Sequence, residues 1–332
     1  MGQSMLAMRA LPRHTLLHLP AKSAFLSQSS GRLNLQHAQG CIRVLAPMAA
    51  NENGGRFRGH VVLVTGASRG IGRVIARSFA GEGAAVALVS TKADGVKRVA
   101  DEIAASGGRA LPLEGDVSSE ADVRRFVART ESALGPIQVL VNNAGIPGPT
   151  APLTEVTLGD WERVLAVNLT GVFLCSREVL KGVIARRDGH GTPAPTGQSA
   201  RTSAILAIIN IGSIAGKISY PQRAPYASAK WALVGLTLTL AEEVGRHGIR
   251  VNCICPGPVE GQLTEEVIAS RARSMSMPLE TVRQRFVGLT MLKRLVRPED
   301  VAATALFLAS DAAASITGQA LDVSGGIATL PY

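Results

Sequence analysis

The stretch HVVLVTGASRGIG, residues 60–72, decides the fold of this chain. A short β-branched run ends at Thr65 and passes at once into a glycine-rich turn, after which an apolar helical pattern begins. Gly66, Gly70 and Gly72 let the backbone turn tightly and approach a phosphate group, and the following helix offers free N–H groups at its positive dipole end. The strand–turn–helix order therefore predicts a dinucleotide site, although the spacing GxxxGxG differs from the GxGxxG fingerprint.

Outward from this turn, strand patterns alternate with helical patterns along the rest of the chain. Strands are predicted at 60–66, 84–90, 109–116, 137–145, 205–213, 249–257 and 320–326. One long helix is predicted over 160–186. Alternating strands and helices predict a parallel sheet covered on both faces, and the continuous apolar strands agree with burial on both sides. We therefore predict an α/β fold, a single doubly wound (Rossmann) domain over 57–330 that binds ligands at the carboxyl ends of its strands.

The end of the second predicted strand indicates which dinucleotide binds. NAD-binding sheets commonly carry an acidic residue there, which holds the ribose 2′-hydroxyl. Here the sequence reads Ser90-Thr91-Lys92, with no acid before Asp94. Arg69, in the glycine turn, and Lys92 would attract a 2′-phosphate, so the sequence favours NADP(H) over NAD(H). The alternative is that both are ordinary surface cations.

Polar residues also stand at the ends of the third and fourth predicted strands. Asp116, followed by Val117, can accept a hydrogen bond from an adenine amine. In the turn NNAG, Asn143, Ala144 and Gly145 can meet the ribose and brace the neighbouring strand. Either motif alone could be a mere turn, but together and in this order they support the dinucleotide prediction.

Tyr226 and Lys230 are four residues apart at the start of a predicted helix, so they share one face. A phenol has a pKa of about 10, and a nearby ammonium would lower it toward neutrality. Ser213, predicted to end the fifth strand, could hold a substrate carbonyl beside the phenol. Asn168 could hold a water near Lys230. A partly exposed helix pair is the alternative for an isolated Tyr-x-x-x-Lys.

In their order, these motifs resemble the short-chain dehydrogenase/reductase family over about residues 57–330. The resemblance implies a nicotinamide cofactor and hydride transfer between its C4 and a carbonyl or carbinol carbon. It implies that Tyr226 donates the proton in reduction and that Lys230 binds the nicotinamide ribose and tunes Tyr226. It also implies that Ser213 orients the carbonyl and that Asn168 supports a proton relay. The expected cofactor-binding residues are Thr65, Gly66, Ser68, Arg69, Gly70, Ile71, Gly72, Ser90, Lys92, Asp116, Val117, Asn143, Ala144, Gly145, Tyr226, Lys230, Pro256, Gly257 and Val259.

The sequence departs from the family pattern after Pro256-Gly257. Many relatives have a threonine four residues past that glycine, which contacts the carboxamide; here Gly261 stands there and Thr264 follows later. The backbone at Val259 is the expected substitute. The segment 260–297 is then expected to form a lid over the substrate. Among its basic side chains are Arg271, Arg273, Arg283, Arg285, Lys293 and Arg294, which indicate either an acidic or carrier-bound substrate or merely solvated helix faces.

The resemblance favours an NADP(H)-dependent carbonyl reductase. The motifs VNLTGVF, NIGSIAG and ITGQALDVSGG are similar to those of 3-oxoacyl-[acyl-carrier-protein] reductases, which serve fatty acid synthesis. A hydroxy-acid or sugar-alcohol dehydrogenase is the enzymatic alternative, and a catalytically silent cofactor-binding scaffold is the alternative of another class. Family members pair their long helices, so a homotetramer is expected. The stretch 188–202, rich in Gly, Pro, Ser and Thr, is predicted to be a surface insertion.

The net charge of +10 is uneven, because residues 1–56 hold six basic residues against Glu52 alone. The remainder has no basic stripe interleaved with aromatics, so no nucleic-acid partner is expected. No run reaches the roughly 18 apolar residues of a membrane span. The first 50 residues resemble an organelle transit peptide, mitochondrial or plastid; a disordered leader, or upstream sequence before a start at Met48, is the alternative. Without targeting, the protein would be cytoplasmic.

The four cysteines suit a reducing compartment. Cys253-Ile-Cys255 lacks the CxxC spacing of a redox or zinc motif. Strand alternation is expected to send its two thiols to opposite faces, and no metal site is expected.

Overall fold

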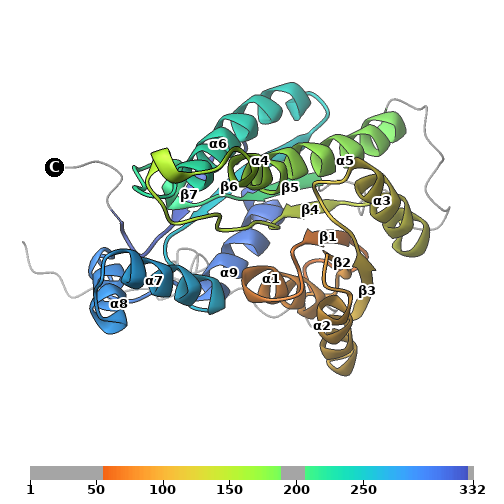
Figure 1. Ribbon diagram of the computed structural model, residues 1–332. Helices are drawn as coiled ribbons and strands as arrows, with labels where there is room; N and C mark the ends of the chain where they lie inside the picture. Colours follow the sequence, from red (N-terminus) through yellow and green to blue (C-terminus); the bar gives the residue numbers. More distant parts are fainter. Residues whose placement is uncertain (1–54, 188–205, 328–332) are drawn as a thin grey trace, which may run out of the picture. The chain divides into compact units, whose positions relative to one another are not determined.

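Seven parallel strands form one sheet in the order β3-β2-β1-β4-β5-β6-β7, within residues 55–187 and 206–327 that the computed structural model describes (Figure 1). The predicted doubly wound α/β fold is thus confirmed. The predicted leader (1–50) and surface insertion (188–202) lie outside the described residues. The strands are β1 (Val61–Thr65), β2 (Ala85–Ser90), β3 (Arg109–Glu114), β4 (Val139–Asn142), β5 (Leu206–Ile211), β6 (Ile249–Pro256) and β7 (Ala320–Val323).

Helices cover both faces of the sheet (Figure 1). They are α1 (Gly70–Gly81), α2 (Ala93–Ala105), α3 (Glu120–Leu134), α4 (Leu158–Leu165), α5 (Gly171–Arg187), α6 (Ala224–Gly245), α7 (Gln262–Ser274), α8 (Leu279–Gly288) and α9 (Pro298–Ala309). The core against α1, α2 and α9 is separate from the core against α3, α5 and α6.

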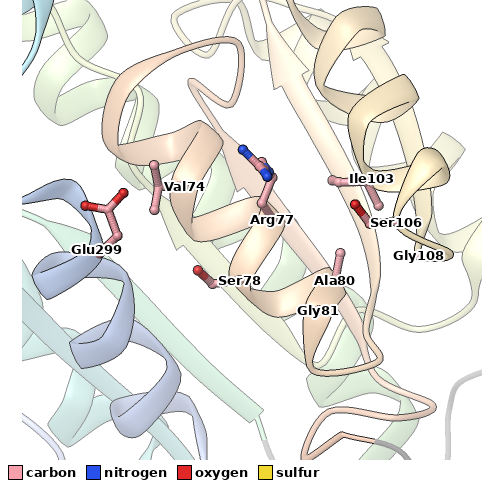
Figure 2. Close-up of a pocket in the computed structure, with 9 residues that line it drawn as sticks. All are labelled: Val74, Arg77, Ser78, Ala80, Gly81, Ile103, Ser106, Gly108 and Glu299. Carbon is pink, nitrogen blue, oxygen red and sulfur yellow. The ribbon is translucent and has the colours of Figure 1, made fainter.

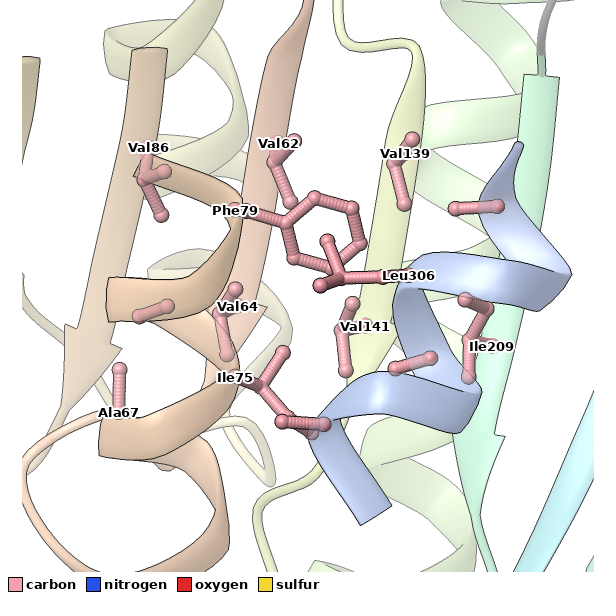
Figure 3. Packing of buried hydrophobic residues seen from close by; sticks show 14 of the residues in the cluster. Val62, Val64, Ala67, Ile75, Phe79, Val86, Val139, Val141, Ile209 and Leu306 are labelled. Carbon is pink, nitrogen blue, oxygen red and sulfur yellow. The ribbon is translucent and has the colours of Figure 1, made fainter. Parts of the chain in front are cut away.

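Strand alternation divides the apolar side chains between these two cores. Val62 and Val64 of β1 belong to the first core, and Val61 and Leu63 to the second. Figure 3 shows Phe79 of α1 packed over the first face of the sheet. Burial of one such side chain contributes about 2 kcal/mol, so the two cores hold the strand ends in fixed positions.

The strand order reverses at β1, which pairs with β2 on one side and with β4 on the other. Val64 is in register with Leu88 of β2 and with Val141 of β4. The chain leaves the carboxyl ends of β1 and β4 toward opposite faces, and a doubly wound sheet binds its ligand in the crevice between them.

The helix predicted over 160–186 is interrupted. Between α4 and α5, residues Ala166–Thr170 form a π-helical turn. The prediction missed it because one extra residue leaves the apolar composition of the helix unchanged. Such turns are rare and occur mostly at functional sites. This one contains Asn168, which is fully buried.

The two thiols of β6 lie on one face, and the expectation of opposite faces was wrong. Residues two apart in a strand point to the same side. The Sγ atoms of Cys253 and Cys255 are 3.8 Å apart, and both side chains are buried. Gly212 packs against them, because an added Cβ there would lie 2.6 Å from the Cys253 sulfur.

Candidate active site

The glycine turn is locked against the NNAG turn after β4. The Asn143 side chain donates to the carbonyl of Thr65 at 2.9 Å and to that of Gly66 at 3.1 Å. The Thr65 hydroxyl accepts from the backbone N–H groups of Asn143 and Ala144 at 3.0 and 3.1 Å. A Cβ on Gly72 would lie 2.4 Å from the Asn143 amide nitrogen, so the two turns touch without room for a side chain.

The start of α1 fits the phosphates of a dinucleotide. Gly66 and Gly70 adopt positive φ values of 65° and 55°, which favour glycine. No atom lies within 4 Å of the place that a Cβ on Gly70 would take, so this backbone is open to a ligand. The first turn of α1 contains no acidic residue, and no side chain caps its N–H groups. These groups are therefore available to an anion.

The predicted 2′-phosphate residues lie at the end of β2. Ser90 donates from its hydroxyl to the Ser68 hydroxyl at 3.0 Å, which joins the strand end to the glycine turn. Lys92 is exposed, and its backbone N–H donates to the Ser90 hydroxyl at 3.2 Å. The Arg69 guanidinium is also exposed, but it donates to the Gln262 side chain of α7 at 2.9 Å.

Asp116 stands in a tight turn after β3. Its carboxylate accepts from the N–H and hydroxyl of Ser118 at 2.9 and 2.7 Å. This turn ends β3 at Glu114, two residues before the predicted boundary. The second carboxylate oxygen is left for a ligand. Val117, next along, is buried against Gly171 at the start of α5.

The end of β6 is held by close backbone packing. Gly257 donates its N–H to the carbonyl of Val323 at 3.0 Å, and a Cβ there would meet Ser324 at 2.9 Å. Val259 forms an isolated parallel bridge with Val296. The two hydrogen bonds of this bridge join Val296 to the C=O of Pro258 and to the N–H of Glu260. The N–H and C=O of Val259 itself take no part in the bridge.

Asn168 braces the loop that follows β4. Its side-chain amide donates to the carbonyl of Ile146 at 2.9 Å and accepts from the N–H of Ile146 at 2.8 Å. The π-helical turn aims this amide at the loop, and Gly145 beside it leaves room, because a Cβ there would lie 3.3 Å from the amide oxygen. The Asn168 side chain, which was predicted to hold a water, thus forms its hydrogen bonds with the backbone of Ile146.

Ser213, Tyr226 and Lys230 come together at the carboxyl end of β5. Ser213 begins a 3-10 turn and accepts from the N–H of Ala215 at 3.1 Å. The Lys230 ammonium is buried, lies 5.7 Å from the centre of the Tyr226 ring, and donates to the carbonyl of Ile211 at 2.7 Å. The half-buried phenol is next to the Ser213 hydroxyl, with which it forms a hydrogen bond.

Burial and neighbouring groups set the electrostatics of this group. Burial raises the pKa of Tyr226, while the Ser213 hydrogen bond and the charge of Arg223 lower it. Burial lowers the pKa of Lys230 to about 8. The groups that lower the pKa of Tyr226 here are Ser213 and Arg223, while the Lys230 ammonium donates to Ile211; the tuning of Tyr226 by Lys230 stays a prediction.

Arg223 was missed from the sequence. It is 2% exposed and directly precedes α6. Its guanidinium lies 5.7 Å from the centre of the Tyr226 ring and donates to the Thr150 hydroxyl and the Pro147 carbonyl, both at 2.7 Å. Its position three residues before Tyr226 was the available signal, but its burial follows only from the fold.

The segment 260–297 contains α7 and α8 and reaches both parts of the site. Arg69 of the glycine turn bonds to Gln262 at the start of α7. Further along α7, Arg271 donates to the carbonyl of Pro221 at 3.1 Å, and its guanidinium lies 4.8 Å from the centre of the Tyr220 ring. Gln262 and Arg271 thus join α7 to the cofactor side and to the loop before Tyr226.

The described residues also form a cavity of about 380 Å³ far from these side chains. Figure 2 shows that it runs along α1, between α2 and α9. Its lining includes Val74, Ser78 and Ile103, and contains none of the predicted site residues. The candidate active site therefore remains the group of residues at the carboxyl ends of the strands, and not this cavity beside α1.

Two searches of the described residues give further findings. No described helix is long and apolar enough to cross a membrane. No group of three or more potential metal ligands occurs among them.

A parallel sheet with a glycine turn and a Ser-Tyr-Lys group defines the class of nucleotide-dependent oxidoreductases. Comparison with known proteins agrees: a family model described as enoyl-(acyl carrier protein) reductase matches residues 66–328. The chain is 39% identical over 272 residues to the 3-oxoacyl-[acyl-carrier-protein] reductase of Synechocystis sp., which covers 80% of this chain and 96% of that one. The chain therefore belongs to the short-chain dehydrogenase/reductase family, as predicted, and is an oxidoreductase.

Solved structures agree with this assignment. A variant of actinorhodin polyketide ketoreductase with NADPH has a TM-score of 0.73 at 34% identity, covering 81% of this chain and 97% of that one. NAD⁺-bound xylitol dehydrogenase has a TM-score of 0.74 at 29% identity, covering 82% of this chain and 100% of that one.

Proposed function

We propose that the protein is an NADP(H)-dependent reductase that converts a ketone to a secondary alcohol. The observation that carries the proposal is the convergence of Ser213, Tyr226 and Lys230 beside the glycine turn. Bound NADPH would supply the hydride. Ser213 orients the carbonyl by a hydrogen bond, and Tyr226 donates a proton to the developing alkoxide. The Lys230 ammonium lies 5.7 Å from the centre of the Tyr226 ring and would hold the ribose of the bound cofactor.

The preference for NADP(H) rests on the residues at the end of β2. No carboxylate ends β2, and the two nearby cations, Arg69 and Lys92, are exposed; Arg69 lies 3.8 Å from the carboxylate of Glu266 in α7. A 2′-phosphate meets attraction at this position, whereas a ribose 2′-hydroxyl lacks its usual carboxylate partner. Among the similar structures, one contains NADPH and another NAD⁺, so the comparison supports both cofactors.

Reduction of a 3-oxoacyl thioester in fatty acid synthesis is the reaction that we favour, because the Synechocystis relative is named for it. Oxidation of a sugar alcohol or hydroxy acid is the second candidate, supported by the similarity to xylitol dehydrogenase. A silent scaffold is disfavoured, since it has no need to keep Ser213, Tyr226 and Lys230 in contact.

Assembly into a homotetramer is part of the proposal. The long helices α5 and α6 expose large apolar side chains, namely Phe173, Trp231 and Leu238, at 44%, 52% and 52%. Burying such side chains against a second copy removes apolar surface from water. Sedimentation equilibrium of the full chain should give four times the chain mass, and a monomer mass would refute this part.

The deciding experiment measures oxidation of NADPH and of NADH, separately, by the full chain with acetoacetyl-coenzyme A. We expect turnover with NADPH to exceed that with NADH and to fall at least about 100-fold in Tyr226→Phe, because proton transfer contributes that much. A Tyr226→Phe variant as active as the wild type would refute the proposed mechanism. Binding of NADPH without turnover of ketones would direct the substrate search to polyols and hydroxy acids.

A further inference from the structure

Two arginines lie around Tyr220, whose ring centre is 6.4 Å from that of Tyr226. Arg271 of α7 and Arg223 before α6 lie 4.8 and 5.9 Å from the centre of the Tyr220 ring. Arg223 also lies 5.7 Å from the centre of the Tyr226 ring. The pair therefore concentrates positive charge next to the proton donor.

No carboxylate pairs with either guanidinium in the part of the chain that the structure describes. Arg223 donates to the neutral oxygens of Thr150 and Pro147, and Arg271 donates to those of Pro221 and Tyr220. In each of the two, the Nε atom is buried without a hydrogen-bond partner. Burying a charge is costly unless it is paired, and like charges near each other add to that cost.

Three other arginines of the segment 260–297 have carboxylate partners. Arg283 bonds to Glu265 and lies 3.5 Å from Glu280. Arg294 and Arg297 both bond to Asp300, at 3.1 and 2.8 Å. Arg271 has no such partner where α7 meets the loop before Tyr226, and it differs from the likewise unpaired Arg273 in being only half-exposed.

The backbone holds Arg223 in place. Gln222 has a φ of 63°, which is uncommon for a residue other than glycine. Its carbonyl accepts from the N–H of Ala151 at 3.0 Å, and its side chain accepts from Ser274 of α7 at 3.4 Å. A left-handed residue directly before Arg223 is the kind of strain that clusters at ligand sites.

We propose that Arg223 and Arg271 form an oxyanion-binding subsite, so that the ketone substrate carries a carboxylate or a phosphate. This inference rests on the proposed reduction at Tyr226. The incoming oxyanion supplies the negative charge that no described carboxylate places beside these two guanidinium groups, and charge-assisted hydrogen bonds to guanidinium are strong. Guanidinium groups suit both anions, because their planar donors match carboxylate and phosphate oxygens.

The test uses two pairs of ketones that differ in charge. Acetoacetate and its neutral ethyl ester test whether the subsite binds a carboxylate. Acetoacetyl-coenzyme A and the neutral N-acetylcysteamine thioester of acetoacetate examine a phosphate. The measured quantity is the ratio of kcat/KM for the charged member to kcat/KM for the neutral member, with NADPH and the full chain.

We expect Arg271→Gln to lower this ratio about 10- to 100-fold in one of the pairs, because hydrogen bonds to charged groups contribute that much. The affected pair identifies the anion as carboxylate or phosphate. The matched control is Arg273→Gln, which removes an exposed charge from the same helix and should leave the ratio within about threefold of the wild type. An unchanged ratio in Arg271→Gln, in both pairs, would overturn the proposal.

A binding measurement separates this proposal from the proposed reduction. Isothermal titration of acetoacetate, its ethyl ester and coenzyme A into the Tyr226→Phe protein with NADPH needs no turnover. Anion binding that is weakened by adding Arg271→Gln supports the subsite even when no ketone is reduced. Anion binding that is absent, or unaffected by Arg271→Gln, removes the subsite even when neutral ketones are reduced. Thermal unfolding shows that each variant is folded.

Discussion

The glycine turn and the segment 260–297 both serve the same site, but different forces hold them. The turn is fixed by half-buried backbone and amide hydrogen bonds, which join Thr65 to Asn143 and Ala144 at 2.9 to 3.1 Å. The segment has a small core of its own, around Ile268, Ala272 and Val282. Arginine side chains join it to other elements at two places, Arg69 to Gln262 and Arg271 to Pro221.

The packing of the glycine turn is dictated by its local sequence, whereas the contacts of the segment 260–297 are dictated by the tertiary fold. A close approach of two backbones excludes every side chain larger than hydrogen, so glycines mark it in the sequence. The long side chain of an arginine can bond to partners far along the chain, and the sequence does not show which partners the fold brings within its reach. The packing of the glycine turn can therefore be predicted from its sequence, whereas the contacts of the segment 260–297 cannot.

Gly72→Ala should break the cofactor side most severely. The new Cβ would lie 2.4 Å from both the Asn143 amide nitrogen and the Gly66 carbonyl oxygen. We expect the free energy of unfolding to fall by about 3 kcal/mol and NADPH binding to weaken, measured by urea unfolding and fluorescence titration. Gly81→Ala in the same helix is the control, since nothing lies within 4 Å of its Cβ position. Equal effects of the two variants would contradict the steric explanation.

Asn168→Ala should disturb the loop between β4 and α4. It removes two hydrogen bonds to Ile146, at 2.8 and 2.9 Å, from a fully buried position. The unpaired groups should lower the free energy of unfolding by about 2 to 3 kcal/mol, measured by urea unfolding. Turnover should fall as well, because the loop borders Tyr226 through Arg223 and Pro147. A loss below about 0.5 kcal/mol would show that water replaces the amide.

Lys230 should make stability depend on pH. Its pKa is lowered to about 8, so between pH 8 and its ordinary 10.5 the folded protein binds fewer protons than the unfolded chain. The cost of burying the ammonium is present below pH 8 and is relieved as the pH rises through this window. Between pH 7 and 9.5, the wild type should gain about 2 kcal/mol relative to Lys230→Met in urea unfolding. A pH-independent difference would contradict this.

Arg283→Gln should have the smallest effect. This arginine pairs with Glu265 and Glu280 on the half-exposed surface of α7 and α8. Surface ion pairs contribute little, so kcat/KM should stay within about threefold of the wild type for charged and neutral ketones alike. A loss of kcat/KM for the charged ketone alone would show that paired arginines also attract substrate. Arg271 would then not differ from the paired arginines in this respect.

The sequence predicted the sheet, the glycine turn and the Tyr226–Lys230 pair because their requirements are local. It missed the π-helical turn, although Asn168, a polar residue in the apolar run AVNLTGVF, was a usable signal. The electrostatics of Tyr226 could not be predicted for a different reason. Which cation acts on Tyr226 depends on burial and on the carbonyl that Lys230 reaches, and neither is written in the spacing of two residues.

The strand order has a consequence for how the protein is made. β1 emerges early in synthesis but needs β4, whose register partners begin at Val139, to complete one side of its ladder. The last parts of the site, Val259 and α7, follow much later in the chain. A nascent chain that stops before them can pair β1 with β2 but has no complete site. Parallel pairing over long separations is slow, so cofactor can assist only the final stage of folding.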